Sequence, residues 1–338
     1  MRGSIFVLSA ASWLAALAPA SANDSIAELT TGGLAFAKTP DVEMRSEDLF
    51  VSEKEIRVRY RFFNAAHDDV VSLVAFPMPD IVWDGLDVNL AIPSDDPENF
   101  LDFHTIADGR EVAAKVEQKA FANGVDVSER LRALGLPLPP QLAATGKALD
   151  ALAPAKQSAL VEAHMATPDD YDVGKGMEHH FAPNWTLKST YFWRQTFPAG
   201  REIVIEHRYR PSVGETVGTM LGSPEIEKQS LAHYQATYCT DADFLVSTRR
   251  AMSKPDKSGF ATSPFYERRI SYILTTGANW AGPIGDFHLV IDKGAPDSLV
   301  SFCADGVKKI GPTQFEVRHA NYTPSRELDI LILYRPKT

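Results

Sequence analysis

The chain has 338 residues, of which 44% are hydrophobic and 23% charged, and its 34 basic and 44 acidic side chains give a formal net charge of −10. This length and hydrophobic content suit about two folded domains and exclude a disordered or collagen-like chain. The excess of acid disfavours binding to nucleic acid or to an anionic membrane through a basic surface. The composition therefore indicates a globular protein without nucleic acid as a partner.

The first 22 residues have the pattern of a secretory signal peptide. Arg2 precedes an apolar run over residues 5–17, and Ala20-Ser21-Ala22 is a small-residue cleavage site. The apolar run is shorter than the roughly 20 residues that cross a membrane, and no later segment approaches that length. We therefore expect cleavage after Ala22 and a mature periplasmic protein without a transmembrane segment.

The two cysteines fit an oxidising compartment. Cys239 and Cys303 make an even number of thiols, and both adjoin strand-like sequence. A disulfide between them would stabilise the fold by about 4 kcal/mol in the chain-entropy model. The alternative is two free thiols, but neither has a neighbouring His or Lys-rich setting that would lower its pKa. The compartment favours the disulfide.

Alternating hydrophobic residues dominate the part of the mature chain before residue 126. Within residues 54–63, apolar side chains at every second position alternate with Arg57, Arg59 and Arg61. This is the pattern of an antiparallel strand with one buried and one solvated face. Further strands are expected over residues 70–76, 185–197 and 203–209, and Asp108-Gly109 predicts a hairpin turn between 103–106 and 112–121.

Residues 126–167 differ from their surroundings because they are rich in Ala and Leu at helical spacing. Asp126 and Glu129 are typical of a helix start, and Pro154 is typical of another. Three short helical runs follow from this pattern. They are too short to be stable alone, so we expect this helical insertion to pack on a neighbouring sheet.

Residues 211–230 are rich in Gly, Pro, Ser and Glu and predict a domain boundary. Alternating runs resume beyond them and indicate a second antiparallel sandwich, with the apolar run 328–334 as a central strand. The predicted fold is therefore mainly β, with two antiparallel β-sandwich domains and a small α-helical insertion in the first. The predicted domains are residues 23–220, with the insertion at 126–167, and residues 221–338.

Motifs with assigned chemistry are absent from the sequence. It contains no G-x-S-x-G elbow, no H-E-x-x-H pair, no phosphate-binding G-x-x-x-x-G-K-[ST] loop and no C-x-x-C pair. Their absence favours a non-catalytic protein, but catalytic groups can also be assembled in space from distant residues. We expect no cofactor.

Glu178, His179 and His180 form the densest group of potential metal ligands. In a strand, Glu178 and His180 share a face while His179 points away, so the triplet offers at most two ligands at once. His164 and His207 are the obvious donors for the remaining positions. The alternative is a solvated loop, because glycines and a proline bracket the triplet.

Two further groups are candidates for binding or catalysis. Trp83 lies among Asp80, Asp84 and Asp87, and a tryptophan with carboxylates suits sugar or cation binding, so Trp83 and Asp84 are candidate ligand contacts. The alternative is a polar loop with one aromatic side chain tucked in. His207 lies on the apolar line of its strand, which is typical of a hydrogen-bonded core histidine. With Asp80 or Asp84 as partner, it would be an acid/base candidate.

Short motifs spread over the mature chain resemble one bacterial family, the domain of unknown function 4424. The resemblance implies an exported protein of the Gram-negative envelope and assigns no catalytic residues. The matching stretches are Asn23-Asp24-Ser25 through Gly32-Gly33-Leu34, Ser46-Glu47-Asp48-Leu49, Val74-Ala75-Phe76-Pro77-Met78-Pro79, Gly135-Leu136-Pro137-Leu138, Tyr191-Phe192-Trp193, Phe197-Pro198-Ala199, Asn279-Trp280, Gly282-Pro283-Ile284-Gly285, Phe302-Cys303 and Leu328-Asp329-Ile330.

Three hypotheses for function follow. The first is a non-catalytic periplasmic module that binds an envelope protein or glycan. The second is a hydrolase of envelope polymers that uses His207 with Asp80 or Asp84. The third is a metal-binding protein that uses Glu178, His179 and His180.

Overall fold

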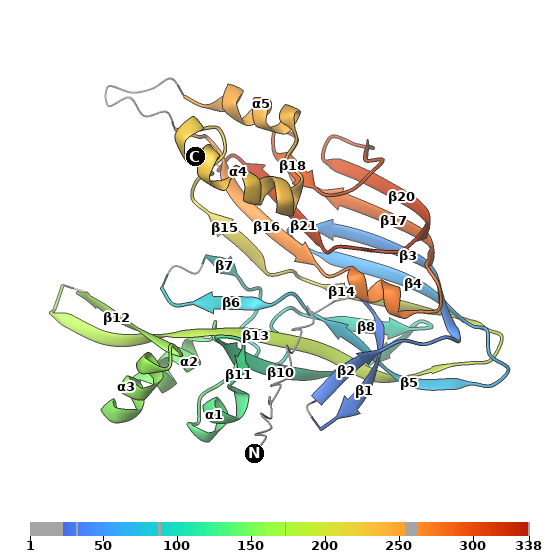
Figure 1. Ribbon diagram of the computed structural model, residues 1–338, viewed down its shortest axis with the longest axis horizontal. Helices are drawn as coiled ribbons and strands as arrows, with labels where there is room; N and C mark the ends of the chain where they lie inside the picture. The colour runs from blue at the N-terminus through green and yellow to red at the C-terminus, as the bar shows by residue number, and fades with distance from the viewer. Residues whose placement is uncertain (1–22, 32, 87–88, 173, 254–261, 337–338) are drawn as a thin grey trace, which may run out of the picture.

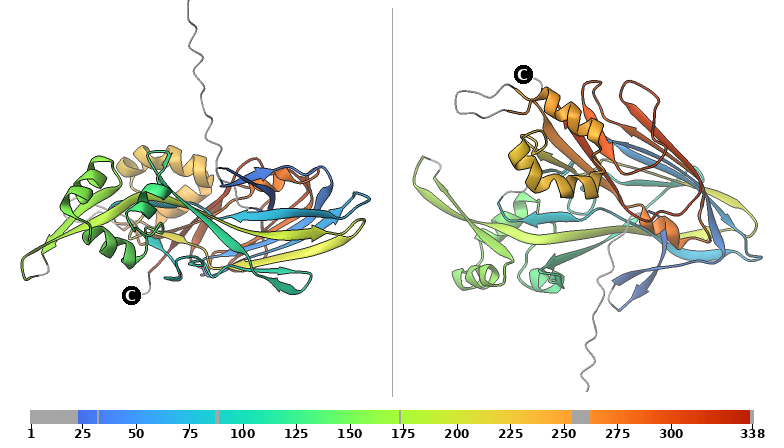
Figure 2. Two further views of the ribbon diagram at one scale, coloured as in Figure 1. Left: turned by 90° about the horizontal axis from the view of Figure 1, so that it is seen from below. Right: turned by 45° about the horizontal axis from the view of Figure 1, so that its top comes forward.

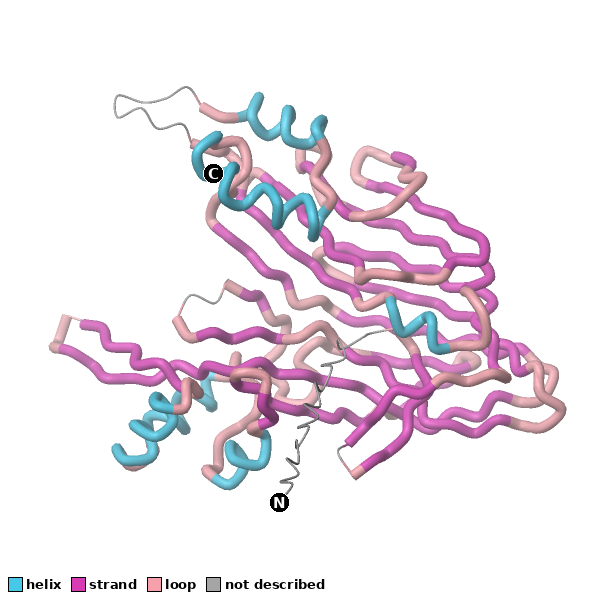
Figure 3. Tube along the Cα trace, in the orientation of Figure 1, coloured by secondary structure: helices cyan, strands magenta, loops and turns pink. Residues whose placement is uncertain are grey.

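The computed structural model describes residues 23–31, 33–86, 89–172, 174–253 and 262–336. Strands dominate this part of the chain, so the mainly β prediction is confirmed (Figure 3). The predicted signal peptide and Asp87 lie outside the described residues. The described strands form three sheets that surround one large core.

The first sheet is built around the 21-residue strand β13, which runs along the lower part of the molecule in Figure 1. All of its strand pairs are antiparallel. Its strands, in order across the sheet, are β11 (Val125–Asp126), β10 (Lys115–Ala122), β13 (Met177–Phe197), β5 (Val70–Pro77), β1 (Ser25–Thr30) and β2 (Gly33–Ala37), and β6 (Ile81–Asp84) and β12 (Ala166–Asp172) also pair with β13.

The second sheet joins strands from both ends of the chain. Its strands β17 and β3 pair in parallel, with Asp286 opposite Ser46 and Asp292 opposite Ser52. The order across the sheet is β19 (Lys308–Lys309), β20 (Gln314–Tyr322), β17 (Ile284–Asp292), β3 (Val42–Ser52), β4 (Ile56–Asn64), β14 (Glu202–Tyr209), β8 (His104–Ala107) and β9 (Arg110–Val112).

The third sheet carries α4 (Pro224–Tyr238) and α5 (Ala242–Ala251) on one face, where Tyr234, Phe244 and Leu245 join a small core with Leu331 and Leu333 (Figures 1 and 2). A 3-10 helix, η1 (Thr275–Asn279), follows β16. The strand order is β18 (Leu299–Phe302), β21 (Leu328–Tyr334), β16 (Tyr266–Tyr272), β15 (Val213–Thr216) and β7 (Leu90–Ala91).

Three short helices lie within the range where helices were predicted. They are α1 (Ser128–Ala133), α2 (Ala143–Asp150) and α3 (Pro154–Glu162), and Figure 1 shows them beside β10, β12 and β13. Leu131, Leu149 and Leu160 are their buried hydrophobic anchors. The prediction that these helices lean on a sheet agrees with the packing of α2 against β13 and of α3 against β12.

The division into two β-sandwich domains is not confirmed. The pairing of β3 with β17 and that of β15 with β16 run across the predicted boundary at residue 220. Side chains from both sides of this boundary, such as Tyr60 and Tyr272, belong to one hydrophobic cluster. A boundary read from composition misses such pairing because the partners are far apart in sequence.

The hairpin at Asp108-Gly109 is confirmed, but its second strand is shorter than predicted. Asp108 and Gly109 both have positive φ, 46° and 75°, and Ala107 pairs with Arg110. The predicted strand over 112–121 is in fact two strands. β9 pairs with β8 in the second sheet, whereas β10 pairs with β13 in the first. The chain thus changes sheets at residues 113–114, where neither residue is in a strand.

Helices α4 and α5 were missed in the sequence. The start of α5 is visible in the sequence as an N-cap residue. The Asp241 carboxylate accepts a 2.7 Å hydrogen bond from the Phe244 amide and caps the helix. Phe244, Leu245 and Thr248 then follow at helical spacing and are buried. No helix of the described residues is long and apolar enough to cross a membrane.

The cysteine sulfur atoms lie at disulfide distance, with 2.11 Å between the sulfurs of Cys239 and Cys303. Cys239 follows the last turn of α4, and Cys303 follows β18. The pair therefore ties the end of a helix to the edge of the sheet on which that helix packs.

Candidate functional site

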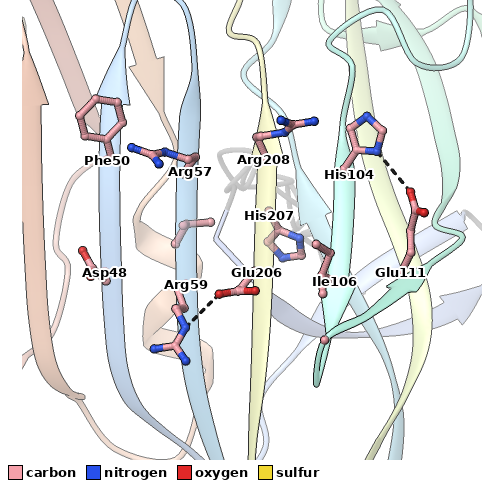
Figure 4. Close-up of a pocket in the computed structure, with 12 residues that line it drawn as sticks. Asp48, Phe50, Arg57, Arg59, His104, Ile106, Glu111, Glu206, His207 and Arg208 are labelled. Carbon is pink, nitrogen blue, oxygen red and sulfur yellow. Dashed lines mark hydrogen bonds and ion pairs between the residues drawn. The ribbon is translucent and has the colours of Figure 1, made fainter.

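A groove of about 890 Å³ crosses the outer face of the second sheet (Figure 4). Its floor is the solvent-facing side of β3, β4, β14, β8 and β9. Because paired residues on neighbouring strands point to the same face, the side chains stand in rows across the strands. Two such rows supply the groove with its charges.

The first row contains Phe50, Arg57, Arg208 and His104, each directly opposite the next on the neighbouring strand. Figure 4 shows these four side chains side by side along the upper part of the groove. The Arg57 guanidinium lies 4.7 Å from the centre of the Phe50 ring. The row therefore presents an aromatic ring, two guanidinium groups and an imidazole.

The second row carries three acids and one arginine. It contains Asp48, Arg59, Glu206, Ile106 and Glu111. Arg59 Nε donates to Glu206 at 3.0 Å, and His288 on β17 contacts Asp48 at 3.0 Å. The acids of this row thus have partners of their own, and Ile106 leaves a partly exposed apolar spot among them.

Arg208 differs from its neighbours in the groove. Arg57 has Glu55 at 3.2 Å, and His104 lies between Asp102 at 3.1 Å and Glu111 at 3.4 Å. Among the described residues, no acidic side chain forms an ion pair with Arg208, which is exposed and directly opposite Arg57. Like charges opposite each other on neighbouring strands repel, so this position favours a bound anion.

His207 belongs to the same strand but points the other way. Its side chain is completely buried, and the alternation along β14 turns it into the core while Glu206 and Arg208 face the groove. Its Nε2 lies 3.0 Å from Asp24 Oδ1, and its Nδ1 lies 3.1 Å from the Thr105 hydroxyl. In a catalytic triad the carboxylate binds Nδ1 and the nucleophilic hydroxyl faces Nε2, so this buried Asp–His–Thr group has the reverse arrangement.

Further buried polar groups surround this Asp–His–Thr group. Asn23, Asp24, Glu47, Tyr60 and Tyr272 are all fully buried. The Asn23 side-chain amide donates to Glu47 at 2.9 Å, and the two tyrosine hydroxyls are 2.9 Å apart. Tyr272 also donates to Glu47, at 3.4 Å. We refer to these five residues, together with His207, Thr105 and Thr276, as the buried polar cluster.

Burial raises the pKa values of both acids in the buried polar cluster. It raises the pKa of Glu47 to about 8, because the charged carboxylate loses its hydration and the Asn23 and Tyr272 hydrogen bonds offset this only in part. Burial likewise raises the pKa of Asp24, against the opposing effect of His207. The cluster is thus held at the centre of the fold, out of reach of a substrate.

The acids proposed as partners of His207 lie elsewhere. Asp80 pairs with Lys188 at 2.8 Å, and Asp84 is exposed at the end of β6. Trp83 is half-buried against the core and opposite Trp185 on β13. The structure therefore brings neither Asp80 nor Asp84 to His207, and Trp83 and Asp84 remain candidate ligand contacts.

The Glu178, His179 and His180 triplet lies on the ribbon formed by β12 and β13. His180 lies between Asp150 at 2.8 Å and Glu178 at 3.2 Å, one carboxylate at each ring nitrogen. These hydrogen bonds raise the pKa of His180, the one to Asp150 most. His179 pairs separately with Asp170. The two histidines thus contact different carboxylates. The described residues hold no group of three or more His, Cys, Asp or Glu side chains that could bind a metal ion.

Comparison with known proteins gives one family. The model of the family described as "Domain of unknown function (DUF4424)" matches residues 22–331. The chain belongs to this family. No curated protein matches this DUF4424 chain. A crystal structure from Legionella pneumophila, of a "putative nutrient binding protein", is similar to it with a TM-score of 0.46 and 14% sequence identity, over 93% of this chain and 70% of that one.

Sequence reasoning missed the groove. Arg57 and Arg59 were recognised as outward residues, and Arg208 shares their period-two pattern on its own strand. The alternating pattern does not show that β4 pairs with β14, so the sequence alone did not place Arg57 opposite Arg208. That opposition is what distinguishes this face from an ordinary solvated sheet.

Proposed function

We propose that this DUF4424 protein is exported to the periplasm and acts there as a non-catalytic binding protein. Its groove would take an oxyanion, a carboxylate or a phosphate, carried by a component of the envelope. The observation that carries the proposal is the register of Arg57 and Arg208, which stand opposite each other without an ion pair for Arg208. The predicted leader and the cysteine pair at disulfide distance support export to an oxidising compartment.

The chemistry of the row suits such a ligand. A guanidinium group is planar and presents parallel N–H donors that match two oxygen atoms of a carboxylate or phosphate. Phe50 and Ile106 supply apolar surface on either side for the non-ionic part of the ligand. The formal net charge of −10 repels anions at long range, but at physiological salt this repulsion is screened beyond about 8 Å. Local geometry then decides which anion stays bound.

The proposal is tested by Arg208→Gln, with Arg194→Gln as the matched control. Arg194 is also exposed, but it lies on β13 in the first sheet. The probes are an oligogalacturonate for carboxylates, a short polyphosphate for phosphates and maltohexaose as a neutral oligosaccharide. Their binding is measured by calorimetry at low and high salt.

We expect one or both anionic probes to bind and maltohexaose not to bind. Arg208→Gln should weaken binding by roughly 10- to 100-fold, the value of a charge-assisted hydrogen-bond pair, and Arg194→Gln should leave it unchanged. The two anionic arms distinguish the chemical source of the oxyanion. Equal affinities of the two variants, or no binding of either anion to the wild type, would contradict the proposal.

A further inference from the structure

The first described residue of the chain is part of the protein core. Asn23, Asp24 and Ser25 are fully buried, whereas the terminus that the predicted cleavage would create usually lies at the surface of a protein. The Asn23 backbone amide donates to the Thr276 hydroxyl, which in turn donates to the Asn23 carbonyl at 2.6 Å. The Asp24 carbonyl accepts a 2.6 Å hydrogen bond from the Trp280 indole. Residues in and next to η1 therefore hold the backbone of Asn23 and Asp24 in place by hydrogen bonds.

The buried polar cluster around Asn23 contains unpartnered acceptors. Among the described residues, Asp24 Oδ2 and Asn23 Oδ1 are buried atoms without a hydrogen-bond partner, as is the hydroxyl group of Tyr209. A buried acceptor without a donor costs about 1–3 kcal/mol, and such atoms are rare in native proteins. The Asp24 and Asn23 atoms belong to residues that adjoin the predicted cleavage site, so a donor at the backbone nitrogen of Asn23 is the candidate for them.

The cluster also lacks a cation for its second carboxyl group. Asp24 has His207, but among the described residues no Lys or Arg forms an ion pair or hydrogen bond with Glu47. The titratable groups that face Asp24 and Glu47 from the packed strands are otherwise phenolic: Tyr60 on β4, Tyr209 on β14, Tyr272 on β16 and Tyr322 on β20. A single positive group at Asn23 would satisfy both the acceptors and the charge.

We propose that removal of the leader after Ala22 produces this group, and that the new α-ammonium of Asn23 occupies the buried polar cluster as an internal cation. The step is hydrolysis of the Ala22–Asn23 peptide bond by water in the active site of a leader peptidase. The Ala22 carbonyl carbon takes the water oxygen and is released as a carboxylate, while the Asn23 nitrogen, which already carries one hydrogen, takes both protons of the water. One peptide N–H donor becomes three N–H donors with a positive charge.

The inference rests on the proposed export, because it needs the leader to be cut at this bond. It assigns a function to the buried acids that catalysis does not explain. Before cleavage, Glu47 is held in its neutral form. After cleavage, the ammonium favours the carboxylate form of both acids, so processing completes the electrostatics of the core. Cleavage thereby becomes a maturation step for the fold as well as a release from the membrane.

The test compares two purified chains, each released from a carrier by a protease that leaves no extra residue. One chain starts at Asn23, and the other starts at Ala20 and so keeps three residues before Asn23. Unfolding by urea is followed from pH 5 to pH 8. We expect the extended chain to lose stability across this range, because Glu47 must be kept protonated in it. The Asn23 chain should lose clearly less, and in Glu47→Gln versions the two pH profiles should become parallel.

The pH profile separates the charge from simple crowding by the three extra residues. Crowding would lower the stability of the extended chain by the same amount at every pH. Parallel profiles in the two chains that carry Glu47 would therefore overturn the proposal.

A second measurement examines the amino group itself. An α-amine ordinarily has a pKa of about 8 and reacts with acylating reagents before lysine does. In the folded Asn23 chain we expect it to react at least about tenfold more slowly than after unfolding, because the group is reached only through opening of the core. Equally fast labelling in the folded and unfolded chains would overturn the proposal.

Intact mass and N-terminal sequencing of protein from the exporting cell distinguish this inference from the proposed function. A mature chain that starts at Asn23 supports it. Cleavage at another bond would overturn this inference and leave export and anion binding intact. An uncut chain would overturn the proposed export as well, whereas the Arg208 experiment stands apart from both.

Discussion

At the scale of single residues, the chain separates its charged groups into two kinds. Arg57 and Arg208 stand on the solvent face of β4 and β14, where water and ligands reach them. His207, one position from Arg208, is fully buried with Asp24. The alternation of a β-strand thus places a groove residue and a core residue next to each other in sequence with opposite environments.

Glu47 provides a prediction at this scale. In a chain that keeps residues before Asn23, its pKa is about 8 in the folded state against 4.5 normally. Because the folded pKa is raised, the stability that protonation contributes is complete below about pH 4.5 and is lost as the pH rises to about 8, by up to about 1.4 kcal/mol per pH unit. Glu47→Gln removes this titration, so its stability relative to wild type should increase with pH.

The measurement is the free energy of unfolding by urea at pH 5, 6.5 and 8, made on chains that keep residues before Asn23. Glu43→Gln is the matched control, since Glu43 lies on the same strand and is half-exposed beside Arg45. That variant should follow the wild type at every pH. A constant difference between Glu47→Gln and wild type across the range would mean that Glu47 does not titrate there.

The residue scale also shows what a sequence can yield. The position of His207 on an apolar line predicted a hydrogen-bonded core histidine, and the structure agrees. Its partner Asp24 lies 183 residues away, and no local pattern connects the two. Glu178 and His180 were expected to share a face, and they contact each other at 3.2 Å. The divergence of their partners depends on Asp150, which comes from a helix.

At the scale of elements, period-two alternation was the most informative signal. It predicted β4, and in β13 it predicted the line of Leu187, Tyr191, Trp193 and Phe197, all of them buried. Ser189, the polar residue on this line, is buried with them. Alternation does not show where the chain leaves β9 for β10, because a change of sheet leaves the hydrophobic pattern intact.

The tie between α4 and the third sheet gives a prediction for elements. A loop of 64 residues separates Cys239 from Cys303, and a disulfide across it restricts the unfolded chain. The double variant Cys239→Ser with Cys303→Ser should lose about 4 kcal/mol of folding stability in the chain-entropy model. Urea unfolding measures this loss, and wild type under a reductant serves as the comparison.

Local contacts define the expected extent of the damage. Ser301 donates to the Tyr238 carbonyl and Arg326 donates to the Ala236 carbonyl, so α4 keeps other attachments without the sulfur bridge. We therefore expect the variant to fold and to lose hydrogen-exchange protection mainly in α4 and α5. Unchanged stability in both the variant and the reduced wild type would show that the two thiols are not joined in solution.

At the scale of the whole molecule, the three sheets share one core. The ring of Phe76, from the first sheet, contacts both the ring of His207 from the second sheet and the ring of Tyr272 from the third. The predicted boundary at residue 220 lies between segments that pair within single sheets. Such pairing depends on partners chosen in space, which is why composition alone suggested two units.

This arrangement predicts one cooperative unfolding transition. If β3 and β17 are integral to the same sheet, neither half of the chain keeps its structure when the other unfolds. Scanning calorimetry of the oxidised protein should give a single peak, and tryptophan fluorescence and far-UV circular dichroism should report the same midpoint. Two resolved transitions, one of them retained by a fragment of residues 23–220, would instead support separate domains.

The parallel pairing of β3 with β17 has a consequence for how the chain would reach its folded state under the proposed export. β3 ends at Ser52, whereas β17 begins at Ile284, so a chain threaded through a translocon amino end first delivers them far apart in time. During that interval the flank of β3 has no neighbour and exposes a row of backbone groups that other chains can recruit. We therefore expect the nascent protein to need shielding by a periplasmic chaperone until its last quarter has emerged.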